Sequence, residues 1–174
     1  EIFLSIIINS AGCGSEMKSI QTNGFEQKVK DITEFLCEIG YNLPDIEIEH
    51  EEVYYDAPCH LVHGQSLDEQ PKIILKIFGF NIVENNEEKL CCGAAGSYVF
   101  SHPNQSAEIL QRKMNYIKDV SSIKSIVTAN PGCQLQLQKG CKENNVKIPV
   151  FHICELMYDQ YMKDPEFSAS FREN

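Results

Sequence analysis

The stretch SIVTANPGC, from Ser125 to Cys133, has the pattern of a buried strand that runs into a tight turn and ends at a cysteine. β-Branched residues favour the strand, and the Asn-Pro-Gly sequence ends it and lets a helix begin. The stretch SIIINSAGC, from Ser5 to Cys13, has the same order of features. We therefore expect two copies of one strand–turn–helix unit, although any strand-to-helix junction tolerates such a pattern. Each cysteine then lies at the carboxyl end of a strand and beside a helix N-terminus, where open α/β sheets place ligands.

Short β-branched runs alternate with amphipathic stretches along the rest of the chain, which is typical of βα units. We predict strands near 3–9, 52–56, 80–84, 124–128 and 148–152, and helices over 25–39, 71–78, 103–120 and 154–162. In the helix 71–78 we expect Ile73, Ile74 and Ile77 to face inward. The predicted fold class is α/β, with a mainly parallel Rossmann-like sheet flanked by helices and built from βα units.

Composition and charge exclude several classes of function. The chain has 174 residues, with 15 basic and 25 acidic side chains and a net charge of −10, which repels nucleic acid. No apolar run is long enough to span a bilayer, and the first residues lack the basic segment of a secretory signal. We expect a cytoplasmic protein, or one held at the inner face of a membrane only through partner subunits.

Eight cysteines are too few for a disulfide scaffold and too many for ordinary usage. Because no export signal precedes them, we expect a reducing compartment, where clustered thiols are more often metal ligands or catalytic groups. Four of them lie in three loop-like segments that follow predicted strands: YDAPCH at 55–60, LCCGAAG at 90–96 and NPGC at 130–133. If these strands are parallel neighbours, all three loops open at one edge of the sheet. The thiols that can meet there are Cys59, Cys91, Cys92 and Cys133.

Four converging thiolates suit either zinc or an iron–sulfur cluster. Zinc sites are often built from Cys-x-x-Cys pairs, which this chain lacks, and adjacent cysteines bind one small ion awkwardly. A cluster spreads its irons over several ångströms, so that the adjacent thiolates of Cys91 and Cys92 can reach different irons. This reasoning favours the cluster and leaves zinc as the alternative.

The three motifs DAPCHL at 56–61, CCGAAG at 91–96 and NPGC at 130–133 resemble the cysteine-rich CCG domain of the heterodisulfide reductase type. The flanking segments 60–65 and 112–114 most resemble the C-terminal part of glycolate oxidase iron–sulfur subunits. The resemblance covers about residues 50–158, and residues 5–20 look like the end of a preceding copy of the domain. It implies a duplicated domain, with 1–45 as the end of the first copy, 46–162 as the second CCG domain and 163–174 as a loose tail.

The resemblance also implies a function. In this family Cys59, Cys91, Cys92 and Cys133 would ligate a cluster, most readily [4Fe-4S], in an electron-transfer subunit. Its partners would be a flavoprotein dehydrogenase subunit that oxidises a 2-hydroxy acid such as glycolate or lactate, and an electron acceptor. The alternatives are a zinc-stabilised interaction domain and a thiol or disulfide reductase subunit.

Two departures from the family pattern matter. The family motif ends Cys-x-x-Cys, but Gln136 stands where the last thiol is expected, which leaves four thiolates and makes direct disulfide chemistry less attractive. The ferredoxin-like segment of the family's iron–sulfur subunits is also missing from the sequence. Either another subunit supplies those clusters or, as we expect, the chain is the C-terminal part of a longer polypeptide.

Other residues receive roles around the predicted cluster. We expect the backbone at Gly93 and Gly96 to bind the cofactor through amide groups, and His60 either to donate to a sulfur or to lie at the surface. Cys13 is either a ligand left from the preceding copy or a structural thiol. The remaining thiols, which we expect to be structural, are Cys37, Cys141 and Cys154.

Overall fold

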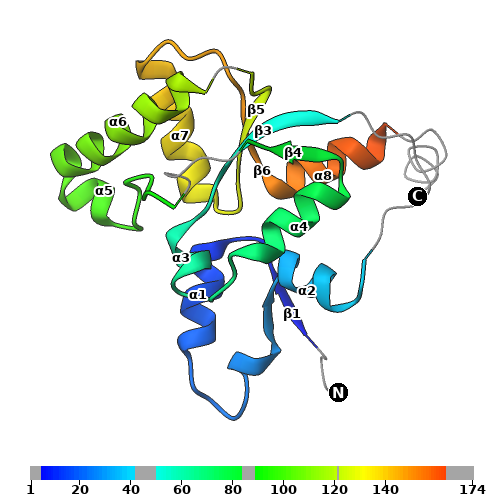
Figure 1. Ribbon diagram of the computed structural model, residues 1–174. Helices are drawn as coiled ribbons and strands as arrows, with labels where there is room; N and C mark the ends of the chain where they lie inside the picture. The colour runs from blue at the N-terminus through cyan, green and yellow to red at the C-terminus, as the bar shows by residue number, and fades with distance from the viewer. Residues whose placement is uncertain (1–4, 42–49, 84–88, 121, 164–174) are drawn as a thin grey trace.

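The computed structural model describes residues 5–41, 50–83, 89–120 and 122–163 (Figure 1). Its strands are β1 (Ile6–Ile8), β2 (Val29–Asp31), β3 (Glu51–Asp56), β4 (Phe80–Ile82), β5 (Ser125–Thr128) and β6 (Val150–His152). Its α-helices are α1 (Ala11–Ser19), α2 (Ile32–Glu38), α3 (Cys59–Val62), α4 (Glu69–Ile77), α5 (Tyr98–Ser101), α6 (Pro103–Asp119), α7 (Pro131–Glu143) and α8 (Ile153–Met162). A short 3-10 helix, η1, spans Glu26–Lys28.

The main sheet has four strands in the order β4-β3-β5-β6, and every neighbouring pair is parallel. In its register, Val53 of β3 lies opposite Ile82 of β4 on one side and Ser125 of β5 on the other. Strands β1 and β2 form a separate, two-stranded parallel sheet. The predicted α/β class with mainly parallel sheets is therefore confirmed.

Helices cover both faces of the main sheet. Successive side chains of β3 point to opposite faces, and apolar residues on both faces pack against helices. Val53 and Tyr55 pack with residues of α4 and α8 on one face, whereas Tyr54 packs with α6 and α7 on the other. These side chains are almost fully buried. Figure 1 shows the two layers, with α6 and α7 to one side of the strands and α4 and α8 to the other.

The strand order reverses between β3 and β5. After β3 the chain passes through α4 to β4 on one side, and after β4 it crosses through α6 to β5 on the other side of β3. In doubly wound α/β folds this reversal opens a crevice at the carboxyl ends of the two strands, and ligands bind there. The loops that carry Cys59 and Cys133 start at these two strand ends.

The predicted single helix over 25–39 is wrong in its first half, where the chain forms η1 and the strand β2 before α2 begins. Val29 is buried in β2, opposite Ile6 of β1, so its apolar character serves a strand. Asp31 then caps α2: its Oδ1 accepts from the Thr33 amide at 2.9 Å, and the Glu34 carboxylate accepts from the Asp31 amide at 3.1 Å. This capping box marks the helix start, and the apolar spacing alone did not reveal it.

The other predicted elements are confirmed with shifted ends, while α3 and α5 were not predicted. Helix α4 begins at Glu69, ahead of Pro71. The inward direction of Ile73 is wrong, because that side chain is 45% exposed while Ile74 and Leu75 are fully buried. Of the predicted tail 163–174, all but Lys163 lies outside the described residues.

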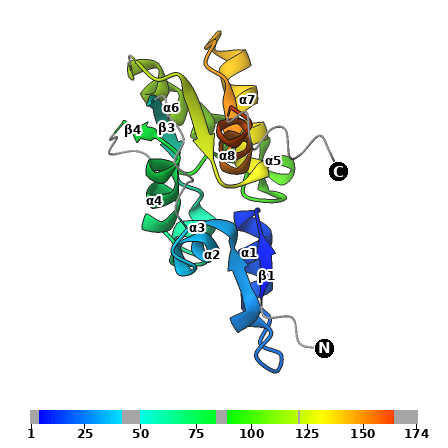
Figure 2. The same ribbon diagram turned by 90° about the vertical axis from the view of Figure 1, so that its right-hand side faces the viewer.

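The N-terminal unit with β1, β2, α1 and α2 lies beside the main unit at the carboxyl edge of β3 and β5 (Figures 1 and 2). The Ala11 amide donates to the Ala129 carbonyl at 3.2 Å, and the Gln65 side chain donates to the Ala11 carbonyl at 2.9 Å. The start of α1 is thereby fixed against the turn after β5.

Within the described ranges, none of the helices has the length and apolar character needed to cross a membrane.

Candidate metal centre

Three loops at the carboxyl edge of the main sheet carry the four cysteines singled out in the sequence. Cys59 is the first residue of α3 and follows β3, and Cys133 lies in the first turn of α7 after β5. Cys91 and Cys92 lie in the loop between β4 and α5. Because β4, β3 and β5 are adjacent and parallel, the three loops leave the sheet at the same edge. The expectation that they open together is confirmed.

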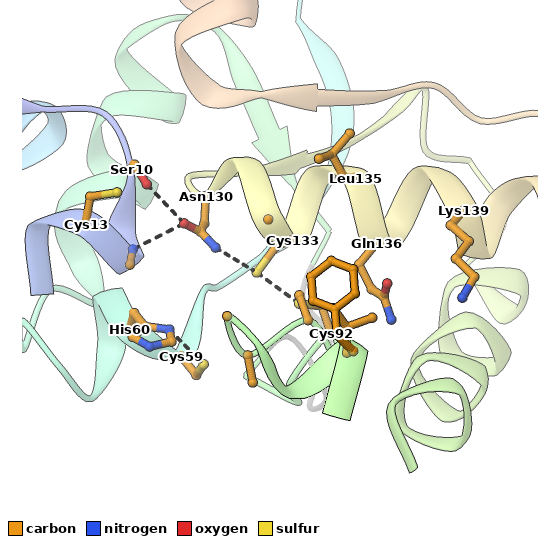
Figure 3. A pocket seen from close by; sticks show the side chains of 17 residues that line it. Ser10, Cys13, Cys59, His60, Cys92, Asn130, Cys133, Leu135, Gln136 and Lys139 are labelled. Carbon is orange, nitrogen blue, oxygen red and sulfur yellow. Dashed lines mark hydrogen bonds between the residues drawn. The ribbon is translucent and has the colours of Figure 1, made fainter. Parts of the chain in front are cut away.

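The structure links the four thiols in a series of contacts, and we call them the thiol quartet. Cys92 Sγ donates to Cys133 Sγ at 3.0 Å, and both side chains are buried (Figure 3). The Cys91 thiol is hydrogen-bonded both to Cys59 and to Cys92. The contacts thus run as one chain from Cys59 through Cys91 and Cys92 to Cys133.

The electrostatics of the quartet favour one thiolate that is solvated by its neighbours. Hydrogen bonds from Cys59 and then from Cys92 lower the pKa of Cys91 far below its usual value. The hydrogen bond to Cys91, followed by burial, raises the pKa of Cys59, and hydrogen bonds to Cys133 and Cys91, followed by burial, raise that of Cys92. Four thiolates cannot coexist at these distances without a cationic centre among them, so the donor set fits a metal group that replaces the thiol protons.

The arrangement does not suit a single small ion. Among the described residues, no group of three or more His, Cys, Asp or Glu side chains converges in a way that could hold one metal ion. Contacts in series, with two sulfurs from adjacent residues, are better matched to a centre that offers several metal atoms.

A cavity of about 610 Å³ opens beside the quartet and is lined by Cys59, Cys92 and Cys133. Figure 3 shows these thiols facing it from α3, from the loop before α5 and from α7. Apolar side chains form part of its wall, among them Phe100 and Leu135, which are 86% and 68% exposed. The cavity beside the quartet therefore has a partly apolar mouth.

Gly93 lies in a turn conformation directly after the two adjacent cysteines. Its φ is +87°, a conformation that favours glycine, and its amide donates to Cys91 Sγ at 3.3 Å. A side chain here would come within 2.6 Å of the Ser106 carbonyl. Gly96 also has a positive φ, +58°, and lines the cavity.

Gln136, which stands in place of the expected fifth thiol, helps to support the turn at Gly93. The Gln136 side chain donates to Ser106 Oγ at 3.0 Å, and Ser106 Oγ donates to the Gly93 carbonyl at 2.8 Å. Both Gln136 and Ser106 are buried. A hydrogen-bond chain from α7 through α6 thus holds the turn after Cys92.

His60, Asn130 and Cys13 also line the cavity (Figure 3). The His60 ring lies with Nδ1 3.6 Å from Cys59 Sγ. Asn130 donates to Cys133 Sγ at 3.5 Å. Cys13 is exposed and lies in the first turn of α1. The Gly-Cys turn of the N-terminal unit therefore lies at the same cavity as the quartet.

Sequence reasoning missed Lys113, whose side chain is fully buried on α6 and forms an ion pair with Asp56 at the end of β3. The signal was present, because Ser106, Leu110, Lys113 and Ile117 follow helical spacing on the buried face of α6. A lysine within such a stripe indicates a buried partner of opposite charge.

The remaining cysteines pack in the cores, as expected of structural thiols. Cys141 is buried among Leu110, Met114 and Leu137 on the α6 and α7 face, and burial raises its pKa. Cys37 and Cys154 pack against the core on the opposite face.

Comparisons with known proteins agree with the site. Residues 53–138 match the family described as "CCG: Cysteine-rich domain". The chain is 31% identical over 171 residues to the "Probable glycolate oxidase iron-sulfur subunit" of Bacillus subtilis (strain 168), an alignment that covers 89% of this chain and 38% of that protein. It is 32% identical over 165 residues to one subunit of the fumarate reductase (CoM/CoB) of Methanothermobacter marburgensis, covering 92% of this chain and 33% of that relative.

A third relative is the "Glycolate oxidase iron-sulfur subunit" of Escherichia coli (strain K12), 27% identical over 144 residues, with 76% of this chain and 35% of that protein covered. The chain therefore spans between about a third and two fifths of the length of these relatives. The matched region contains all three cysteine loops and the strands that position them. Residues 53–138 of the chain belong to the CCG cysteine-rich domain family.

Proposed function

We propose that the thiol quartet holds an iron–sulfur cluster, of the [4Fe-4S] type, and that the chain is an electron-transfer part of an oxidoreductase. The observation that carries the proposal is that three separate loops bring Cys59, Cys91, Cys92 and Cys133 to one edge of the sheet, where their thiols form a series of contacts. When bound, such a cluster accepts and releases single electrons. The relatives named as iron–sulfur subunits support this reading.

The chain's own residues would bind the cluster and shield it. The four thiolates are its ligands, and the Gly93 amide, which already donates to Cys91 Sγ, stabilises the negative charge on the sulfur. The Asn130 side chain does the same at Cys133. Burial of Cys92 and Cys133 keeps water from that side of the site. Gly96 and His60, which line the cavity, complete its wall in this proposal.

We further propose that the electrons come from a flavoprotein subunit that oxidises a 2-hydroxy acid and leave to a separate acceptor. The names of the two glycolate oxidase relatives support this donor class. The exposed Phe100 and Leu135 at the mouth of the cavity give a partner an apolar surface near the quartet. The free thiols fit a reducing compartment such as the cytoplasm.

The same reading divides the chain into residues 1–45, as the end of a preceding copy, and residues 46–162, as the CCG domain. Two separate sheets support this division. The matching turns at Cys13 and Cys133, each in the first turn of a helix after a strand, support it as well.

Anaerobic purification followed by a redox cycle tests the function. The proposal predicts a brown protein whose broad absorption near ~400 nm bleaches with dithionite and returns with an artificial electron acceptor. A colourless protein with one zinc per chain would contradict the proposal and favour a structural domain. An iron–sulfur chromophore that cannot be reduced and reoxidised would contradict the electron-transfer role.

A further inference from the structure

A buried polar group links the three cysteine loops behind the thiol quartet. The Lys113 ammonium forms an ion pair with the Asp56 carboxylate and donates to the Leu90 carbonyl. On its other oxygen, Asp56 accepts a hydrogen bond from Thr128 Oγ1 at 3.1 Å. We call Lys113, Asp56 and Thr128 the polar hub. All three side chains are almost completely buried.

Each contact of the polar hub lies a few residues before a cysteine. Leu90 immediately precedes Cys91, Asp56 stands at the end of β3 before Cys59, and Thr128 ends β5 before Cys133. Lys113 itself comes from α6, the helix that follows the Cys91-Cys92 loop. The ammonium therefore ties the Cys59 loop to the Cys91-Cys92 loop, and Asp56 extends the link through Thr128 to the loop that carries Cys133.

An ion pair at this depth calls for a reason other than stability. Removing two charges from water costs so much that apolar side chains of similar size often serve the fold as well. Lys113 is the one buried Lys or Arg among the described residues. Its three donors can hold separate acceptors in fixed directions, which an apolar side chain in the same place cannot do.

The charge of the polar hub also acts on the quartet. The Lys113 ammonium donates to the carbonyl of Leu90, the residue that precedes Cys91, so its positive charge lies close to the quartet. In a site of low dielectric constant such a fixed charge is screened far less than one at the surface. Reduction adds negative charge to a cluster, so a nearby cation favours the reduced form.

We propose that Lys113, Asp56 and Thr128 are positioning residues, which set the spacing of the three cysteine loops and tune the reduction potential of the cluster held there. The inference rests on the proposed function, because it assigns the polar hub to that same site.

The test compares the wild-type chain with four variants after identical anaerobic purification. Lys113→Met and Asp56→Asn each remove one charge, and Thr128→Val and Thr128→Ser respectively remove and retain the hydroxyl. Lys118→Met, at an exposed position of α6, serves as the control. Iron and sulfide per chain, loss of iron to a chelator, the electron paramagnetic resonance signal of the reduced protein and its midpoint potential are measured.

We expect Thr128→Val to lose iron to the chelator about 10-fold more readily than the wild type, whereas Thr128→Ser and Lys118→Met behave like the wild type. We expect the midpoint potential to become more negative in Lys113→Met and more positive in Asp56→Asn. A hub that serves only the stability of the fold would not shift the two potentials in opposite directions.

If either charge variant fails to fold, the Thr128 pair still decides the positioning claim, because both replacements are small and neutral. Wild-type iron retention in Thr128→Val, or potential shifts of the same sign in the two charge variants, would overturn the inference and leave the proposed function intact. A wild-type chain without iron and sulfide would instead overturn the proposed function.

Discussion

The backbone amide of Gly12 donates to Oδ1 of Asn130 at 3.2 Å, across 118 residues of sequence. The amide group of the same side chain donates to Cys133 Sγ at 3.5 Å. Asn130 therefore connects the Gly-Cys turn of the N-terminal unit with the thiol quartet, and Figure 3 shows it between the two. The two similar strand–turn–helix units meet through this residue at one cavity.

Two substitutions of Asn130 separate its acceptor contacts, from Gly12 and Ser10, from its donor contact to Cys133. Asn130→Asp keeps the acceptor for Gly12 but loses the donor to Cys133, whereas Asn130→Ala loses both. We expect Asn130→Ala to lower the free energy of unfolding in urea by about 1–2 kcal/mol, and Asn130→Asp to lower it less. In the cluster-bound protein we expect a more negative midpoint potential for Asn130→Asp, because a carboxylate replaces a donor beside a sulfur ligand. Equal unfolding energies for the two variants would show that the contacts from Gly12 and Ser10 contribute nothing.

The turn after Cys92 requires glycine at position 93 for two reasons. Gly93 and Gly96 both have positive φ, so alanine at either position costs about 1–2 kcal/mol of folding free energy. Only at Gly93 would the added Cβ lie 2.6 Å from the Ser106 carbonyl, which adds about 1–3 kcal/mol. We expect Gly93→Ala to lower stability and iron content clearly more than Gly96→Ala, as measured by urea unfolding and iron analysis. Similar losses in both variants would contradict the role of the close contact.

Ser106 holds the same turn through its hydroxyl. Ser106→Ala removes the donor to the buried Gly93 carbonyl and the acceptor for Gln136, so we expect a loss of about 1–3 kcal/mol in thermal or urea unfolding. Ser101→Ala, at an exposed site in α5, is the control and should stay within about 0.5 kcal/mol of the wild type. A stability of Ser106→Ala equal to that of the control would refute this account of the turn.

His152 makes the stability of the fold depend on pH. Burial lowers its pKa below the ordinary value of 6.5, although the Ala129 backbone, Glu155 and Asp31 act in the opposite direction. The unfolded chain then binds a proton more readily than the folded one, so stability is present above about pH 6.5 and falls as the pH drops through that value. The contribution of this one group has a slope of at most ~1.4 kcal/mol per pH unit.

The variant His152→Asn isolates that contribution. His152 caps α8 by accepting from the Cys154 amide at 3.2 Å, and asparagine can cap a helix without titrating near neutral pH. We expect urea unfolding between pH 5 and pH 7 (about the range in which histidine titrates) to show a shallower decline for the variant. Parallel pH profiles of the two proteins would contradict the assignment.

Much of the architecture could be predicted because strands and turns have local signals. The stretch from Ser125 to Cys133 folds as strand β5, a turn and helix α7, as its β-branched run and Asn-Pro-Gly turn indicated. The helix predicted over 25–39 failed because Val29 suits a strand as well as a helix. Only its pairing with Ile6, a contact between distant parts of the sequence, decides between the two.

The gathering of the four cysteines followed from one assumption, that their strands are parallel neighbours, and the order β4-β3-β5 confirms it. The residues that support the cysteine loops could not be predicted in the same way. Lys113 contacts Leu90, 23 residues away, and Gln136 contacts Ser106 of α6, 30 residues away, and no local pattern tells which acceptor either side chain will find. Their burial on α6 and α7 depends on how the helices pack against the sheet.

The account stands on the claim that the thiol quartet holds one iron–sulfur centre. Iron and acid-labile sulfide are measured in the anaerobically purified chain and in Cys59→Ser, Cys91→Ser, Cys92→Ser and Cys133→Ser, with Cys141→Ala as the matched control from the core. We predict about four irons and four sulfides per chain in the wild type and the control, and a large loss in each of the four serine variants. Wild-type iron and sulfide in any of those four variants, or none in the wild type, would contradict the claim.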